Sequence, residues 1–138
     1  MELHPVDVVE DITPEDFHNL YVKTAKPVLL KNYAKNWPAL SKWTYDFLKE
    51  KAGEHKVKLH GKWQDNEPTK IEMPPVKEVP FSEYLDMLEN DVKSDLRIFL
   101  FNLFKLVPEL VNDFDFPPIM EGWLKDYPYM FFGCAGSN

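Results

Sequence analysis

Cysteine is nearly absent from the sequence, since Cys134 is the only one among 138 residues. A single cysteine excludes an internal disulfide framework and any zinc site built from several cysteines, and it fits a reducing compartment. Its neighbours Gly133 and Ala135 carry no charge that could activate the thiol, and no histidine lies near it in the sequence. We therefore expect Cys134 to be a small packed residue rather than a nucleophile.

Positive charge is also scarce, because 16 Lys and Arg residues stand against 23 Asp and Glu residues, giving a net charge of −7. Such an excess of acids repels a phosphate backbone or an anionic membrane surface. The most apolar segment, 98–111, is interrupted by polar residues and falls short of the ~20 apolar residues of a membrane span. The first residues lack the basic and apolar stretches of a signal peptide. We expect a soluble, cytoplasmic protein without nucleic-acid or membrane partners.

Apolar and aromatic residues are abundant, at 44% and 14% of the chain. This content is typical of a folded protein with an apolar core and excludes compositional disorder. A chain of this length hides roughly two-thirds of its extended surface on folding. We therefore predict one domain that spans residues 1–138.

Strand and helix signals alternate along the chain. Thr13 followed by Pro14 and two acids is typical of a helix start, and Lys51 with Gly53 is typical of a helix end. Polar, turn-rich residues fill 61–75. The expected helices span about 14–22, 37–53, 80–90 and 107–112. The expected strands are 6–9, a buried strand 28–30, 57–60, a central strand 96–103, and 128–132. The helix after Pro80 carries an apolar stripe of Phe81, Tyr84, Leu85 and Leu88.

Aromatic residues mark the last two expected strands. Strand alternation places Phe99 and Phe101 on one face of the first strand, and Tyr129 and Phe131 on one face of the second. Core packing is the interpretation that composition favours. The sharper alternative is the wall of a small-molecule pocket, in which Tyr129 places a hydroxyl among apolar groups.

Other candidate groups point to no specific chemistry. His55 and His60 are five residues apart on an expected strand, so their side chains should point to opposite faces and should not share a metal ion. A set of acids in the last third of the chain could suggest paired-carboxylate catalysis, but solvated loop charges are the favoured interpretation. These acids are Glu109, Asp113, Asp115, Glu121 and Asp126. The sequence contains no phosphate-binding loop, dinucleotide fingerprint, nucleophile elbow or zinc-protease motif.

The last expected strand, 128–132, calls for sheet neighbours on both sides. The glycine pair of 133–136 predicts a turn into a further element. From this pattern we expect either that the sequence is a truncated piece of a larger protein or that a second copy covers the edge as a homo-oligomer.

Several short segments together resemble a known family. They are 27–31 (Pro-Val-Leu-Leu-Lys), 36–40 (Asn-Trp-Pro-Ala-Leu), Trp43, 45–48, 81–85 (Phe-Ser-Glu-Tyr-Leu), 97–100 (Arg-Ile-Phe-Leu), 108–110 (Pro-Glu-Leu) and 131–138. In order and approximate spacing they are similar to the N-terminal part of JmjC or cupin-like oxygenases of the asparaginyl-hydroxylase type. These enzymes depend on Fe(II) and 2-oxoglutarate.

The resemblance implies an α+β fold. Residues 1–95 would form an N-terminal helical cap, and residues 96–138 would form the first strands of a double-stranded β-helix (cupin or jelly roll), with the barrel incomplete in this chain. In the family, His-x-Asp and a later His hold the iron and leave positions open for 2-oxoglutarate and O₂. The sequence contains no His-x-Asp or His-x-Glu. The resemblance therefore implies that this chain contains no catalytic or metal-ligating residue. Fe(II) and 2-oxoglutarate are the cofactors that it implies for an intact relative.

Position by position, the resemblance assigns a few residues to a site. Phe99 falls where relatives can have a Tyr that hydrogen-bonds 2-oxoglutarate, a bond that Phe cannot make. Tyr129 and Phe131 match positions that line the cosubstrate pocket, and Phe101 matches a substrate-side position. The chain is thus interpreted as the N-terminal portion of a hydroxylase that acts on a protein or small molecule, inactive by itself. The alternative is a non-catalytic binding module that uses the aromatic face.

Overall fold

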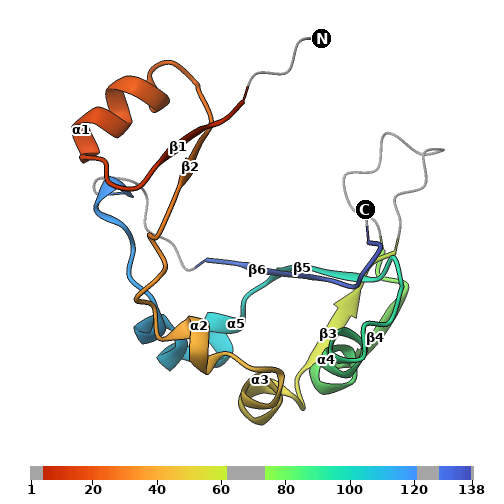
Figure 1. Ribbon diagram of the computed structural model, residues 1–138. Helices are drawn as coiled ribbons and strands as arrows, with labels where there is room; N and C mark the ends of the chain where they lie inside the picture. Colours follow the sequence, from red (N-terminus) through yellow and green to blue (C-terminus); the bar gives the residue numbers. More distant parts are fainter. Residues whose placement is uncertain (1–4, 62–73, 121–127, 138) are drawn as a thin grey trace, which may run out of the picture. The chain divides into compact units, whose positions relative to one another are not determined.

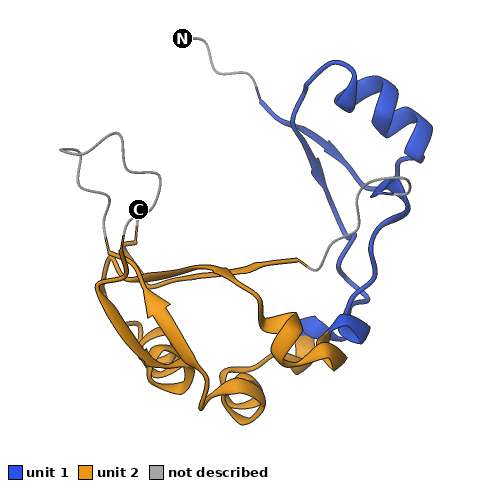
Figure 2. Cartoon of the chain, turned by 180° about the vertical axis from the view of Figure 1, so that it is seen from behind, with its two compact units in different colours: residues 1–40, 111–126 blue, residues 41–110, 127–138 orange. Residues whose placement is uncertain are grey.

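The computed structural model describes residues 5–61, 74–120 and 128–137 (Figure 1). The chain divides into two compact units, residues 1–40 with 111–126 and residues 41–110 with 127–138 (Figure 2). Most of the polar stretch predicted at 61–75 lies outside the described residues. The single-domain organisation and its division after residue 95 stay predictions.

The first unit is built on a short parallel strand pair. Its elements are β1 (Asp7–Val9), α1 (Pro14–Phe17), η1 (His18–Val22), β2 (Val28–Leu30) and η3 (Pro118–Met120). β1 and β2 pair in parallel with Asp7 opposite Val28, and α1 and η1 form the crossover that parallel strands require. Both strands are where the sequence predicts them. The predicted burial of β2 is wrong, because Leu29 is 55% exposed and, within the described residues, β2 has one neighbouring strand.

The helical segment 14–22 confirms the predicted helix start. The Oγ1 atom of Thr13 accepts a hydrogen bond from the N–H of Asp16 at 3.1 Å, and Pro14 occupies the first turn. The last five residues, η1, are wound as a π-helix. Tyr21 of η1 is buried, and its hydroxyl hydrogen-bonds to Asp7 of β1. Burial, and then the nearby Asp7 carboxylate, raise the pKa of Tyr21.

The second unit holds the longer helices and two antiparallel strand pairs. Its elements are α3 (Tyr45–Ala52), β3 (Lys56–Leu59), β4 (Lys77–Pro80), α4 (Phe81–Glu89), β5 (Arg97–Phe101), α5 (Leu103–Leu106) and β6 (Met130–Gly133). β3 pairs with β4, β5 pairs with β6, and a bridge between His60 and Arg97 joins the end of β3 to β5. The mixed helix-and-sheet class is as predicted. No closed barrel forms within the described residues.

Two short helices replace the single helix that the sequence predicts over 37–53. They are α2 (Ala39–Lys42) and α3, and Thr44 separates them with extended backbone. The Oγ1 atom of Thr44 accepts a hydrogen bond from the N–H of Phe47 at 3.1 Å, so Thr44 starts a new helix instead of continuing the first. A further short segment, η2 (Pro108–Asp113), is a 3₁₀-helix near the position of the last predicted helix. Among the described residues, no helix is long and apolar enough to cross a membrane.

Helix α4 fully buries three residues of its predicted stripe, Phe81, Tyr84 and Leu85, while the fourth, Leu88, is half-buried. Its first residues have no side-chain cap. Instead, the N–H of Phe81 donates to the carbonyl of His55 at 2.7 Å, and the N–H of Ser82 donates to the carbonyl of Gly53 at 2.9 Å. The chain that leaves α3 thus satisfies two of the free N–H groups at the start of α4.

A buried hydroxyl connects α4 to the β5–β6 pair. The Tyr84 oxygen lies 2.9 Å from the carbonyl oxygen of Leu96, which directly precedes β5, and 3.2 Å from that of Phe132 in β6. The hydroxyl proton is shared between these two carbonyls. The Sγ atom of Cys134 donates to the same oxygen at 3.7 Å. Cys134 is buried, which confirms the packed residue predicted for it. Burial first, and then Cys134, raise the pKa of Tyr84.

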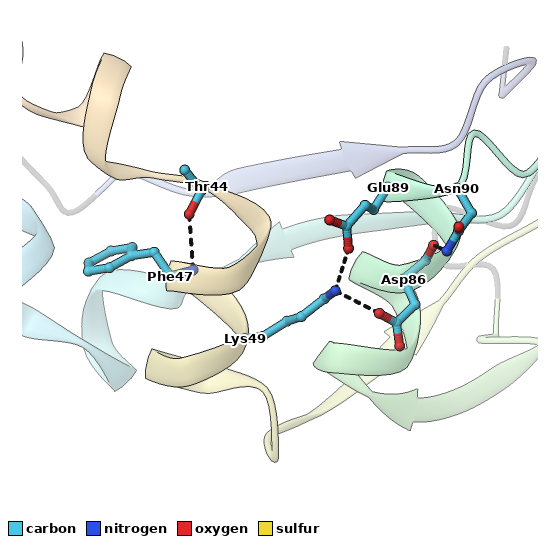
Figure 3. Close-up of polar contacts among 6 residues, drawn as sticks. All are labelled: Thr44, Phe47, Lys49, Asp86, Glu89 and Asn90. Carbon is cyan, nitrogen blue, oxygen red and sulfur yellow. Dashed lines mark hydrogen bonds and ion pairs between the residues drawn. The ribbon is translucent and has the colours of Figure 1, made fainter.

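A charged contact joins α3 to α4 on the surface (Figure 3). The Nζ atom of Lys49 lies 2.7 Å from Oδ1 of Asp86 and 2.5 Å from Oε2 of Glu89. Hydrogen bonds to Asp86 and then to Glu89 raise the pKa of Lys49. The three side chains therefore stabilise the charged form of the lysine across the helix pair.

We expect Tyr84→Phe to lower the free energy of unfolding by about 1–3 kcal/mol, because two buried carbonyls and a thiol lose their common partner. Urea unfolding with an unchanged m-value would measure this loss. The matched control is Tyr45→Phe, which removes an exposed hydroxyl and should leave the urea midpoint almost unchanged. Equal midpoints for the two variants would contradict a structural role for the Tyr84 hydroxyl.

We expect Lys49→Met to destabilise the protein in a pH-dependent way. Folding raises the pKa of Lys49. The ion pairs therefore stabilise the protein fully below about pH 10.4, the pKa of an unperturbed lysine, and this stabilisation is lost as the pH rises through the higher pKa of the folded state. The urea midpoints of the two proteins should therefore differ at neutral pH and converge in strong alkali. Lys93→Met is the control, since Lys93 is exposed and forms no ion pair within the described residues. A difference that persists unchanged in alkali would argue against the ion pair.

Candidate functional site

A bulge in β5 determines how its aromatic side chains are distributed. Ile98 pairs with Phe132 and Phe101 pairs with Met130, so the register shifts between them. Leu100 lies in this shift with a φ of 50°, a left-handed conformation that leucine rarely adopts, and it is 62% exposed. The extra residue reverses the alternation of side chains. The prediction that Phe99 and Phe101 share one face is therefore wrong.

Phe101 belongs to the core side of the strand pair. Its ring centroid lies 5.0 Å from that of Phe81 and 6.4 Å from that of Phe132, while the ring of His55 stacks on it at 6.0 Å. Phe81 and Phe132 also meet edge to face at 5.2 Å. The substrate-side role predicted for Phe101 stays a prediction, and its packing is that of a core residue.

The opposite side of β5 and β6 presents a set of exposed rings. Phe99 and Phe131 meet edge to face at 6.1 Å and are 46% and 60% exposed. The ring of His60 approaches Phe99 at 5.7 Å, and the guanidinium of Arg97 lies 5.4 Å from the Phe99 centroid. We call Arg97, His60, Phe99 and Phe131 the ring face. Two residues assigned to the pocket from sequence, Phe99 and Phe131, are thus brought together.

Tyr129 directly precedes β6 and is exposed. It makes no ring contact or hydrogen bond with the other residues that the structure describes. The role predicted for Tyr129 in the cosubstrate pocket stays a prediction. Phe99 and Phe131 offer no polar atom of their own, so any polar recognition on the ring face falls to Arg97 and His60.

Arg97 is the residue that sequence reasoning missed. It is half-buried, and its Nη2 atom lies 3.5 Å from the carbonyl oxygen of Gly61. One signal was present in the sequence, since Arg97 is the only arginine among 16 basic residues. Its position beside exposed rings follows from the strand pairing and could not be read from that signal.

The acids near residue 110 do not all behave as predicted. Asp113 is only 4% exposed, so the interpretation as a solvated loop charge is wrong for it, and it has an interaction partner in the structure. Glu109 forms an exposed ion pair with Lys51 at 3.5 Å. Glu121 and Asp126 lie outside the described residues. Paired-carboxylate catalysis gains no support from this arrangement.

Sequence comparison identifies the family of the chain. A family model described as a cupin-like domain matches residues 14–127, which is most of the chain. The chain belongs to the cupin-like domain family. It is also 31% identical over 117 residues to the lysine-specific demethylase JMJ21 of Arabidopsis thaliana, and 25% identical over 140 residues to the arginine-specific demethylase JMJ22 of the same plant. These matches confirm the predicted resemblance to JmjC and cupin-like proteins.

The cupin-like chain corresponds to a small part of these relatives. The first match covers 83% of the chain but 11% of the relative, and the second covers 94% of the chain and 25% of the relative. Both relatives are therefore much longer than this sequence. Lysine or arginine demethylation is named for those longer proteins.

The described residues of the cupin-like chain do not fit a bound iron ion. Fe(II) oxygenases need two histidines and a carboxylate that converge on one point. His55 stacks on the core ring Phe101 while His60 contacts Phe99 on the ring face, so the two histidines point to opposite sides as predicted. Within the described ranges, no three His, Cys, Asp or Glu side chains come together.

We expect Leu100→Gly to stabilise the protein by about 1 kcal/mol, because glycine adopts a positive φ without the strain that a leucine bears there, and the exposed leucine side chain loses little packing. Leu100→Val should destabilise it, since a β-branched residue is poorer still at this φ. Urea midpoints of the three proteins would measure both changes. A loss of stability in Leu100→Gly equal to that in Leu100→Val would show that the bulge is not strained.

Proposed function

We propose that the chain is the N-terminal portion of a JmjC-type hydroxylase that depends on Fe(II) and 2-oxoglutarate. Residues 1–95 would form the cap, and residues 96–138 would form the first strands of its double-stranded β-helix. The match to a cupin-like domain across 14–127, together with the two demethylase relatives, carries this proposal. The antiparallel pairing of β5 with β6 is compatible with neighbouring strands of such a barrel.

The role proposed for the ring face is to line the cosubstrate pocket. Phe99 and Phe131 would supply an apolar wall and Tyr129 a hydroxyl, which is the usual composition of a small-molecule site. The iron ligands would come from a part of the enzyme other than these 138 residues. The intact enzyme would couple oxidative decarboxylation of 2-oxoglutarate to hydroxylation of a substrate, and the names of the relatives favour a protein side chain.

The experiment is an intact-mass measurement on the protein isolated from its natural source, followed by Fe(II) titration with and without 2-oxoglutarate. We expect a mass above 16.3 kDa, the mass of this chain, and one tightly bound iron per protein. Zn(II) displacement and recovery of iron binding after chelation serve as controls for a specific site.

A natural protein of 16.3 kDa that binds no Fe(II) would overturn the proposal. It would favour instead a non-catalytic module that uses the exposed rings of β5 and β6 to hold a partner. Size-exclusion chromatography of the same sample would then show whether the edge of β6 that has no partner strand among the described residues pairs with a second copy.

A further inference from the structure

The first unit contains a cavity that the proposed function does not use. Its volume is about 500 Å³, which is within the range of small-molecule sites, and it is open to solvent. None of its lining residues belongs to β5 or β6. Four of the eight, Val9, Asp11, Ile12 and Thr13, precede the segment 14–127 that matches the cupin-like family. The cavity is therefore separate in sequence from the ring face and lies partly outside the family match.

Two carboxylates line the cavity, those of Asp11 and Asp16, and both side chains are exposed. The hydroxyl of Thr13 donates to Oδ2 of Asp16 at 2.9 Å. A carboxylate has about four acceptor sites, so Asp16 can still accept a hydrogen bond from a ligand. No Lys, Arg or His is among the described residues that line the cavity. Like charges at one cavity repel each other, and a bound cation relieves this repulsion.

The rest of the cavity wall is largely apolar. Tyr21 is 8% exposed and its hydroxyl hydrogen-bonds to Asp7, while the hydroxyl of Tyr33 donates to the carbonyl of Ile12 at 3.5 Å. Because both hydroxyls are used within the chain, the two tyrosines contribute mainly their rings to the cavity. Leu20, which is 55% exposed, adds an aliphatic side chain. Apolar surface beside negative charge fits a cation that has an apolar body.

We propose that this cavity binds a small primary alkylammonium ion. The ammonium group donates charge-assisted hydrogen bonds to the carboxylates of Asp11 and Asp16. The alkyl chain lies against Leu20 and the tyrosine rings. Binding needs neither iron nor 2-oxoglutarate, so the site goes beyond the proposed function and can be tested separately from it.

The experiment is a titration of the ¹⁵N-labelled 138-residue chain with n-butylammonium at constant ionic strength. The backbone amide signals of Asp11, Asp16 and Leu20 should shift to saturation in nitrogen–proton correlation spectra. At the same concentrations 1-butanol, which has the alkyl chain but no charge, should not shift them. Ammonium, which has the charge but no alkyl chain, should bind more weakly than n-butylammonium.

Variants separate the charge from the apolar wall. Asp11→Asn and Asp16→Asn each remove one charge and keep the side-chain shape, and we expect each to weaken n-butylammonium binding about threefold and both together about tenfold. Leu20→Ala should weaken n-butylammonium binding and leave ammonium binding unchanged. The matched control is Glu15→Gln, which removes an exposed acid of α1 that does not line the cavity and should bind as the unmodified chain does. The wider spectrum of each variant would show that it is folded.

Three results would overturn the proposal. The first is an absence of saturable shifts with n-butylammonium, and the second is an equal response to 1-butanol. The third is a loss of binding in Glu15→Gln as large as that in Asp11→Asn, which would indicate general attraction of cations to an acidic surface. None of these results depends on iron, so they leave the oxygenase proposal to its own test.

Discussion

The second unit depends on one buried hydroxyl. The Tyr84 oxygen sits where a helix meets two strands, and it contacts the carbonyls of Leu96 and Phe132 as well as the thiol of Cys134. A buried polar group stabilises a fold only when its partners are in place, so this contact holds α4, β5 and β6 in one relative position. Arg97 directly follows Leu96 in the chain, and its placement therefore rests on the same contact.

The bulge at Leu100 divides the aromatic residues of β5 between packing and exposure. Without the bulge, Phe99 and Phe101 would point to the same face of the strand. Both rings would then lie in the core or both would lie on the surface. With it, Phe101 joins Phe81 and Phe132 in the core, and Phe99 remains outside beside Arg97. A single strained residue thus lets one short strand complete the core and still place a ring on the surface.

Local signals in the sequence predicted much of the fold, because they act through neighbouring residues. Thr13 caps its helix as predicted, and three of the four residues of the α4 stripe, Tyr84 among them, are buried as their spacing indicated. The break at Thr44 was missed because the apolar periodicity continues through it. The bulge at Leu100 was missed because leucine gives no sign of a positive φ. The position of Arg97 beside the ring of Phe99 could not be predicted at all, since it depends on the strand pairing and on the bulge.

The mutual arrangement of α3 and α4 has a consequence for how this part of the protein opens. The first N–H groups of α4 donate to the carbonyls of Gly53 and His55, just after α3 ends. Loosening of the segment that follows α3 leaves the first N–H groups of α4 unpaired, and fraying of the first turn of α4 leaves the carbonyls of Gly53 and His55 unpaired, so the two events are coupled. The helix pair therefore behaves as one cooperative unit in local unfolding, and its amide protons should exchange with solvent together rather than from the helix ends inward.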